Sequence, residues 1–134
     1  MPLMLAALGS LLAVVLAAPL VIDLFVHGRA TVERQGAVTL RGVVQCSVPT
    51  LVALEGEIVE TFRRGDDAFG TFATEIACDT TPTPWAVTVT SESGVTFRPG
   101  FASGDVRAVG FDPESGVFTG VASFVILHLT RSPR

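Results

Sequence analysis

Residues 37–46 read Ala-Val-Thr-Leu-Arg-Gly-Val-Val-Gln-Cys, so apolar and polar side chains alternate up to a cysteine. In an extended chain successive side chains point to opposite faces, and strict alternation predicts a strand with one buried face. Every second residue would lie on that inward face: Val38, Leu40, Gly42, Val44 and Cys46. The stretch therefore predicts a β-rich domain with a cysteine in its core.

The same alternation recurs through the rest of the chain and sets the expected fold class. Gly, Pro and Asp separate the candidate strands, which cover residues 20–26, 37–46, 51–62, 69–78, 85–89, 105–111 and 117–129. Short strands with turns at this spacing are typical of a two-sheet sandwich. Residues 124–127 are apolar on both faces, which predicts a central or covered strand. We expect an all-β sandwich of seven or eight strands.

The chain has two cysteines, Cys46 and Cys78, and both fall on the inward faces of their predicted strands. In an exported chain such a pair most simply forms a disulfide. Closing a loop of this length stabilises a domain by about 3–4 kcal/mol in the chain-entropy model. A redox-active pair would normally show Cys-x-x-Cys spacing, which is absent. We therefore expect a structural disulfide that crosses or flanks the core.

The N-terminal residues predict export. No charged side chain occurs from Pro2 to Ile22, and small residues would allow signal-peptide cleavage after Ala17 or Ala18. Pro19 disfavours the second of these sites, and no basic residue precedes the apolar run. A retained membrane anchor reaching to about residue 22 is the alternative, because the run is long enough to span a bilayer. We expect a signal peptide over 1–18 and a folded domain over 20–130, secreted or on the extracytoplasmic face of the cell envelope.

Charge and composition exclude several classes of function. The net charge is −4, and all the basic residues are arginines scattered along the chain, which argues against a nucleic-acid-binding face. His27 and His128 have no partner at metal-ligand spacing, and no serine stands in a Gly-x-Ser-x-Gly context. Glu55, Glu57 and Glu60 resemble a carboxylate set but fit a solvated sheet face better. We expect no catalytic residue, no metal, no cofactor and no enzymatic activity.

Two regions are candidates for binding. The densest charge lies on the strand 51–62 and the turn after it, which predicts a surface for a protein or cell-envelope partner formed by Glu55, Glu57, Arg63, Arg64 and Asp66. Arg64-Gly65-Asp66 spells an adhesion tripeptide, but the chemistry of a turn explains these residues without it.

Two alternative functions stay open. One is a carrier of small apolar ligands with a pocket near Trp85 and Phe97. The other is an extracytoplasmic accessory subunit, held at the membrane through residues 2–22 if these are not cleaved.

The chain also resembles a known family. Residues 23–26, 28–30 and 36–42, followed by Cys46, look like the opening of an actinobacterial family of small secreted proteins that is known only as a domain of unknown function. Counterparts of Cys78, Trp85 and residues 99–102 extend the resemblance over roughly residues 20–110. It implies a secreted immunoglobulin-like sandwich with one disulfide and no known activity. The chain departs from the family in lacking a basic start and in having Val-Val-Gln before Cys46, where Thr-Tyr is usual.

Overall fold

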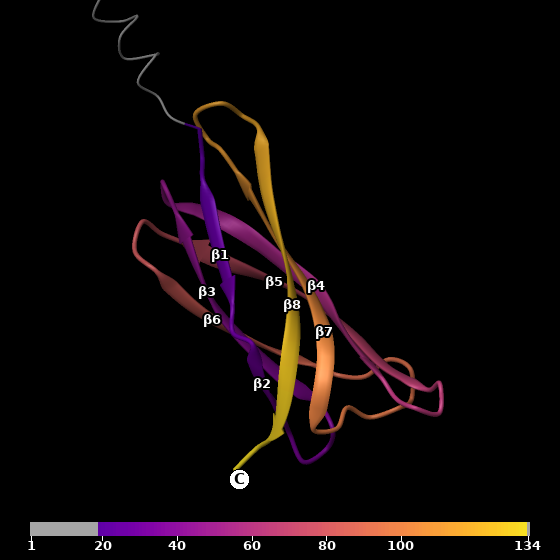
Figure 1. The fold of residues 1–134 in the computed structure, drawn as a ribbon. Helices are drawn as coiled ribbons and strands as arrows, with labels where there is room; N and C mark the ends of the chain where they lie inside the picture. The colour runs from indigo at the N-terminus through magenta and orange to yellow at the C-terminus, as the bar shows by residue number, and fades with distance from the viewer. Residues whose placement is uncertain (1–18, 134) are drawn as a thin grey trace, which may run out of the picture.

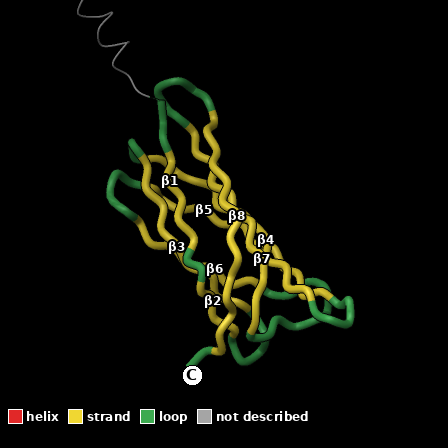
Figure 2. Tube along the Cα trace, in the orientation of Figure 1, coloured by secondary structure: helices red, strands yellow, loops and turns green. Residues whose placement is uncertain are grey.

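The computed structural model describes residues 19–133, which form eight strands in one continuous hydrogen-bonded sheet. The strands are β1 Ile22–Val26, β2 Arg29–Val32, β3 Val38–Cys46, β4 Thr50–Thr61, β5 Asp67–Cys78, β6 Thr83–Val89, β7 Gly100–Phe111 and β8 Phe118–Arg131. The described residues contain no helix, so the all-β prediction is confirmed (Figure 2). The predicted signal or anchor segment, residues 1–18, lies outside the described part of the chain.

The N-terminal strands divide their pairing between two groups of strands. β1 pairs antiparallel with the second half of β3, with Ile22 opposite Cys46. β2 pairs with the start of β3 and also runs parallel to β8, with Arg29 opposite His128. β6 lies along the other edge of β3. β1, β3 and β6 therefore form one group, and β2 links it to the strands that follow (Figure 1).

The second group runs in the order β8-β7-β4-β5, and all its neighbouring strands are antiparallel. Both groups contribute to one core, which includes Leu40 and Val44 from β3, Leu54 and Ile58 from β4, and Leu127 from β8. Alternation places these side chains together because every second residue of each strand points into this core. The outward side chains of β4, β7 and β8 are left on the opposite face.

A disulfide joins Cys46 at the end of β3 to Cys78 at the end of β5, with the two Cα atoms 5.8 Å apart. It links the two groups of strands, and beside it the backbone N–H of Cys46 donates a hydrogen bond to the carbonyl oxygen of Asp79, the residue after β5, at 2.8 Å. The predicted structural disulfide is confirmed, and both cysteines are buried.

Three details of the strands differ from the sequence prediction. β2 was not predicted, because four residues after Gly28 are too few to show a period. β7 begins at Gly100 rather than at residue 105. β8 is central, between β2 and β7, as predicted, but its outward face is uncovered and leaves Phe124 and Ile126 exposed. Within residues 19–133, no helix of the length and apolarity needed to span a membrane occurs.

Candidate functional site

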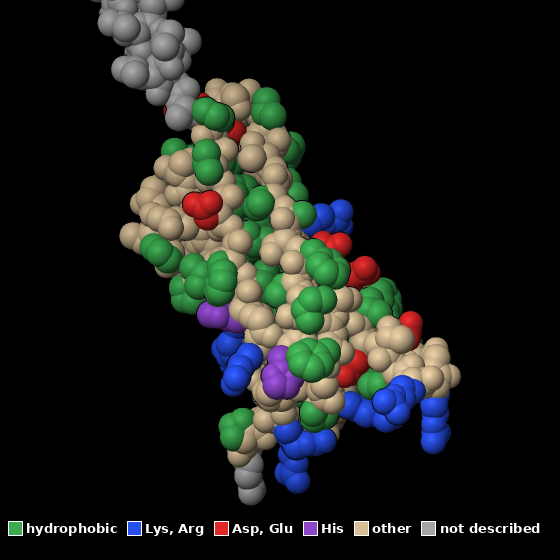
Figure 3. All heavy atoms as spheres, in the orientation of Figure 1, with side chains coloured by type: hydrophobic (Ala, Val, Ile, Leu, Met, Phe, Trp, Pro, Cys, Tyr) green, Lys and Arg blue, Asp and Glu red, His purple; other side chains and the backbone are tan. Residues whose placement is uncertain are grey.

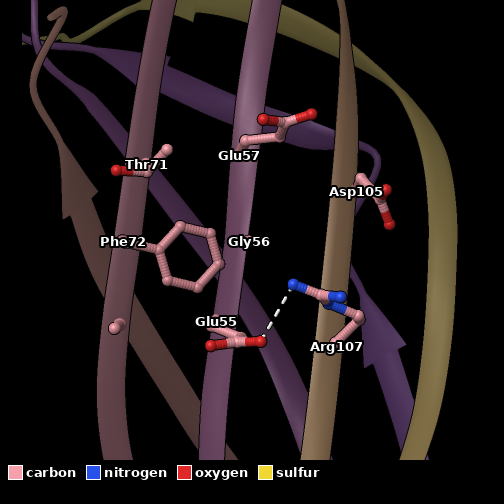
Figure 4. Close-up of a pocket in the computed structure, with 8 residues that line it drawn as sticks. Glu55, Gly56, Glu57, Thr71, Phe72, Asp105 and Arg107 are labelled. Atoms are coloured by element: carbon pink, nitrogen blue, oxygen red, sulfur yellow. Dashed lines mark ion pairs between the residues drawn. The ribbon is translucent and has the colours of Figure 1, made fainter.

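A shallow hollow lies on the outward face of β5, β4 and β7. Its volume is about 670 Å³, and its charged lining comes from Glu55 and Glu57 on β4 and from Asp105 and Arg107 on β7. The register of β4 and β7 sets Glu55 opposite Arg107 and Glu57 opposite Asp105. Figure 4 shows Arg107 reaching across to Glu55, with Glu57 and Asp105 towards the other end of the hollow.

The two cross-strand pairs differ in charge. Arg107 Nη2 lies 2.9 Å from Glu55 Oε1, and both side chains are largely exposed, so this ion pair adds little stability. Glu57 faces Asp105, and like charges directly opposite each other are unfavourable in a sheet. Glu55–Arg107 is the one ion pair within residues 19–133. The Glu57–Asp105 end of the hollow therefore carries negative charge that no side chain of the described domain balances by direct contact.

Gly56 makes room for the aromatic ring of Phe72, which lines this hollow. A Cβ atom at Gly56 would lie 2.9 Å from the ring of Phe72 and closer still to the carbonyl oxygen of Asp105. Only glycine allows the Phe72 ring to lie over β4 at this point. Gly56 therefore allows both the Phe72 ring and the backbone of β7 to approach β4 closely.

A row of apolar side chains continues this face on β7 and β8. Phe101, Phe124 and Ile126 are 71%, 70% and 60% exposed. Phe124 lies opposite Asp105, Ile126 opposite Ser103, and the ring of Phe101 stacks on His128 at 5.0 Å between centroids. Figure 3 shows hydrophobic side chains following β8 down the front of the molecule, with charged side chains beside them. We call this row and the charged hollow together the outer face.

The structure divides the predicted charged surface into two places. Glu55 and Glu57 belong to the outer face, whereas Arg63, Arg64 and Asp66 lie in the turn between β4 and β5. Arg63 lies six positions after Glu57, which in an extended chain corresponds to roughly 20 Å. Gly65 adopts φ +86° in this turn, which explains the glycine of the Arg-Gly-Asp tripeptide by backbone conformation. The five predicted residues do not form one continuous site.

Trp85 and Phe97 are core residues, with 6% and 2% of their surfaces exposed. The indole of Trp85 lies over Gly42 of β3, where any Cβ atom would collide with it. Phe97 lines a hollow at the end of β2 whose lining does not include Trp85. The two rings thus fill separate parts of the interior, and their arrangement gives no support to a ligand pocket between them.

Glu60 is the buried carboxyl that the sequence pattern did not separate from Glu55 and Glu57. It is 2% exposed, and one carboxyl oxygen accepts a hydrogen bond from the backbone N–H of Arg98 at 2.9 Å. Burial raises the pKa of Glu60, and the N–H of Arg98 and the charge of Arg98 oppose that shift. Glu60 therefore acts as an anchor for the segment that leads into β7.

The histidines and carboxylates do not converge. His27 contacts the ring of Phe25, and His128 contacts Phe101, so both occupy surface or edge positions. No group of three or more His, Cys, Asp or Glu side chains that could hold a metal ion occurs within residues 19–133.

Sequence reasoning missed Asp105, Arg107, Phe101, Phe124 and Ile126 as site residues. The alternation of residues 105–111 did place Asp105 and Arg107 on one face of a strand. Their position opposite Glu57 and Glu55 depends on the register of β7 against β4, which no local pattern encodes. A doubly apolar strand was likewise interpreted as covered, whereas one side of β8 is open.

No family model and no curated protein matches the chain. Solved structures that show a distant likeness to the chain include the following two. One is the sporulation control protein Spo0M from Bacillus subtilis, with a TM-score of 0.38, 10% identity, and coverage of 87% of this chain and 51% of that chain. The other is the alkylpurine DNA glycosylase AlkC from Pseudomonas fluorescens bound to DNA with an abasic site analog, with a TM-score of 0.39, 13% identity, and coverage of 86% and 32%. The chain spans about half and about a third of these two proteins.

Proposed function

We propose that this chain is an exported, non-enzymatic binding module with an immunoglobulin-like sandwich fold. The division of the N-terminal stretch between β3 and β8 supports this fold, since the stretch contributes to both groups of strands. So does the separation of β1-β3-β6 from β8-β7-β4-β5 around one core. The disulfide differs from that of antibody domains because it ends on β5 rather than on a central strand. The resemblance to the actinobacterial secreted family is part of the same proposal.

Two features support export. The Cys46–Cys78 disulfide is of a kind that persists in oxidising compartments outside the cytoplasm. The uncharged residues 2–22 precede the domain and fit a signal peptide or, alternatively, a membrane anchor. With either of these, we expect the domain on the extracytoplasmic side.

The outer face is the proposed binding surface, and the exposed row of Phe101, Phe124 and Ile126 is the observation that carries this proposal. Contiguous large apolar side chains on a soluble domain mark interaction sites. Protein interfaces place aromatic and aliphatic side chains at the centre and charged side chains at the rim. Here the apolar row is bordered by Glu57, Asp105 and Arg107, which fit that rim. The excess of carboxylates predicts a protein partner with basic side chains opposite Glu57 and Asp105.

Site-specific photo-crosslinking tests the proposal. A photoreactive phenylalanine analogue is placed at position 101, 124 or 25 of the full chain, produced in an actinobacterial host. Phe25 is the matched control because it is an exposed phenylalanine on β1, which belongs neither to the charged hollow nor to the apolar row. A discrete protein adduct from positions 101 and 124, but not from position 25, is expected. The adduct from position 101 should weaken in the double variant Phe124→Thr/Ile126→Thr and persist in Phe25→Thr.

Equal adducts from all three positions would refute a specific face. An adduct with twice the mass of the chain would show that the partner is a second copy of this chain rather than a different protein. Threonine is used because it keeps the preference for strand while removing apolar surface. Circular dichroism of both variants confirms that each is folded.

A further inference from the structure

Five arginines gather at the end of the molecule where β4 turns into β5 and where β2 and β8 end. One hollow of about 400 Å³ is lined by Arg63, Arg64 and Arg98 with Asp66. A second, of about 320 Å³, is lined by Arg34, Arg98 and Arg131 with Glu33. Arg98 lines both, so the hollows are neighbours. Figure 3 shows basic side chains concentrated at this lower end of the molecule. We call this cluster the arginine pole: Arg34, Arg63, Arg64, Arg98 and Arg131.

Arg98 is held in place between the two hollows. Its guanidinium lies 4.8 Å from the centre of the Phe62 ring, and its backbone N–H donates to the buried Glu60. A guanidinium stacked on an aromatic face keeps its N–H edges free for hydrogen bonds in the ring plane. Arg98 is therefore oriented before any ligand arrives.

The pole concentrates positive charge on an acidic protein. The net charge of the chain is −4, yet the lining of the two hollows holds five arginines against the carboxylates of Asp66 and Glu33. Glu33 also accepts a hydrogen bond from the hydroxyl of Thr39. Within residues 19–133 the one ion pair is Glu55–Arg107, so no arginine of the pole lies within ion-pair distance of a carboxylate there.

This clustering corrects the expectation that the arginines are scattered. The five residues come from four separate parts of the sequence, and the fold brings them to one end.

We propose that the arginine pole binds a polyanion whose charged groups are phosphates. Guanidinium forks match phosphate oxygens with paired hydrogen bonds, and arginine is favoured over lysine for such contacts. Two adjoining hollows that share Arg98 suit successive charged groups on one chain. In each hollow a single anion would also lie near one repelling carboxylate, Asp66 or Glu33. A ligand with several negative charges is attracted by all five arginines together.

The pole lies far from the point where the N-terminal residues join the domain. Pro19 lies at the opposite end of the strands, and the twelve residues of β4 between the two ends span roughly 40 Å. A membrane anchor or a cleaved N-terminus at residue 18 would leave the pole free. This surface is separate from the outer face, so the inference does not depend on the proposed function.

Binding of inorganic polyphosphate to the full chain tests the proposal. Titration calorimetry at several salt concentrations gives the affinity and its salt dependence. Two double variants each remove two positive charges from one hollow: Arg63→Gln/Arg64→Gln from the first and Arg34→Gln/Arg131→Gln from the second. Each should weaken binding on the order of tenfold or more, and should flatten the plot of log affinity against log salt by about one unit for every arginine–phosphate pair removed. The use of two variants keeps the test decisive if one of them fails to fold.

Arg29→Gln/Arg41→Gln is the matched control, because it removes the same charge from positions outside both hollows. It should leave the affinity within about threefold of the wild type. If this control lost as much affinity as the pole variants, the change in net charge alone would explain the effect, and the proposed site would be overturned. Absence of binding to polyphosphate would overturn it as well. Equal or tighter binding of poly-L-glutamate, whose charged groups are carboxylates, would overturn the assignment to phosphate polymers. None of these variants changes the outer face, so failure here leaves the crosslinking result intact.

Discussion

The backbone N–H of Leu20 donates a buried hydrogen bond to Asp112 Oδ2 at 3.1 Å, across 92 residues of sequence. Asp112 Oδ1 accepts a second bond from the N–H of Glu114 in the turn between β7 and β8. This carboxylate therefore ties Leu20, just before β1, to the turn of the β7–β8 hairpin. Leu20 and Ile22 are themselves core residues, so only Pro19 separates the core from residues 1–18.

Replacement of Asp112 by Asn should lower the melting temperature at neutral pH, because a neutral amide accepts these bonds less strongly. The N–H groups of Glu114 and then Leu20 lower the pKa of Asp112. A lowered pKa stabilises the fold above the unfolded value of about 4, and this contribution disappears as the pH falls through the folded pKa. Thermal melts between neutral and acidic pH should show the wild type losing its advantage over Asp112→Asn on acidification. A constant difference across that range would contradict the assignment.

Replacement of Glu60 by Gln should raise stability at neutral pH. Gln keeps an acceptor for the N–H of Arg98 and removes a charge that burial disfavours. The raised pKa of Glu60 means that its protonated form stabilises the fold below the ordinary value of 4.5, and that this contribution is lost as the pH rises through the folded pKa. Melting curves should therefore show the largest gain for Glu60→Gln at neutral pH and convergence with the wild type near pH 4. Glu75→Gln, which removes an exposed carboxylate of β5, is the control.

The double variant Cys46→Ser/Cys78→Ser should lose about 3–4 kcal/mol of unfolding free energy, since the disulfide closes a loop of 32 residues. Urea denaturation of the variant and of reduced wild-type protein should give matching midpoints, both below that of the oxidised protein. A variant as stable as the oxidised protein would show that the link between β3 and β5 is not needed to hold the two groups of strands together.

Gly42→Ala should destabilise the domain by about 1–3 kcal/mol, because its Cβ would collide with the Trp85 indole and the carbonyl oxygen of Phe25. Gly120→Ala is the matched control on β8, where the nearest atom to the new Cβ is a Val109 methyl at 3.5 Å, an ordinary contact. Trp85 is the only tryptophan, so its fluorescence reports the change directly. Equal melting temperatures for the two variants would argue against close packing of Trp85 on Gly42.

Intact mass should distinguish the two fates of the N-terminal run. We expect a species in the medium that begins at Ala18 and gains the mass of two hydrogens on reduction, since cleavage after Ala17 leaves Leu20 in the core. A full-length species found only in the membrane fraction would identify residues 2–22 as an anchor instead.

Strands such as β3 were predictable because their alternation is local: Val38, Leu40 and Val44 are buried, and Arg41 between them is exposed. The disulfide was predictable from composition, because Cys46 and Cys78 are the only two cysteines in the sequence. β2 escaped prediction because its place depends on two neighbours, β3 and β8, rather than on its own four residues.

The candidate sites were less accessible to sequence reasoning. The pairing of Glu55 with Arg107 required the register of β4 against β7. The exposure of Phe124 and Ile126 required knowledge that nothing in the described domain covers the outer side of β8. Glu60 has the same residue type and nearly the same position as Glu57, yet the two differ in burial because they alternate across the strand.

The order of residues along the chain thus determined the strand content, the inward faces and the disulfide, since all three depend on the two-residue period of an extended backbone. Only the tertiary structure decided which charges meet. It joined Arg63 and Arg64 with Arg34 and Arg131 around Arg98, and it set Glu57 against Asp105. The physical reason is that strand order and register bring together residues far apart in sequence, and their energies lie in long-range contacts that no local pattern records.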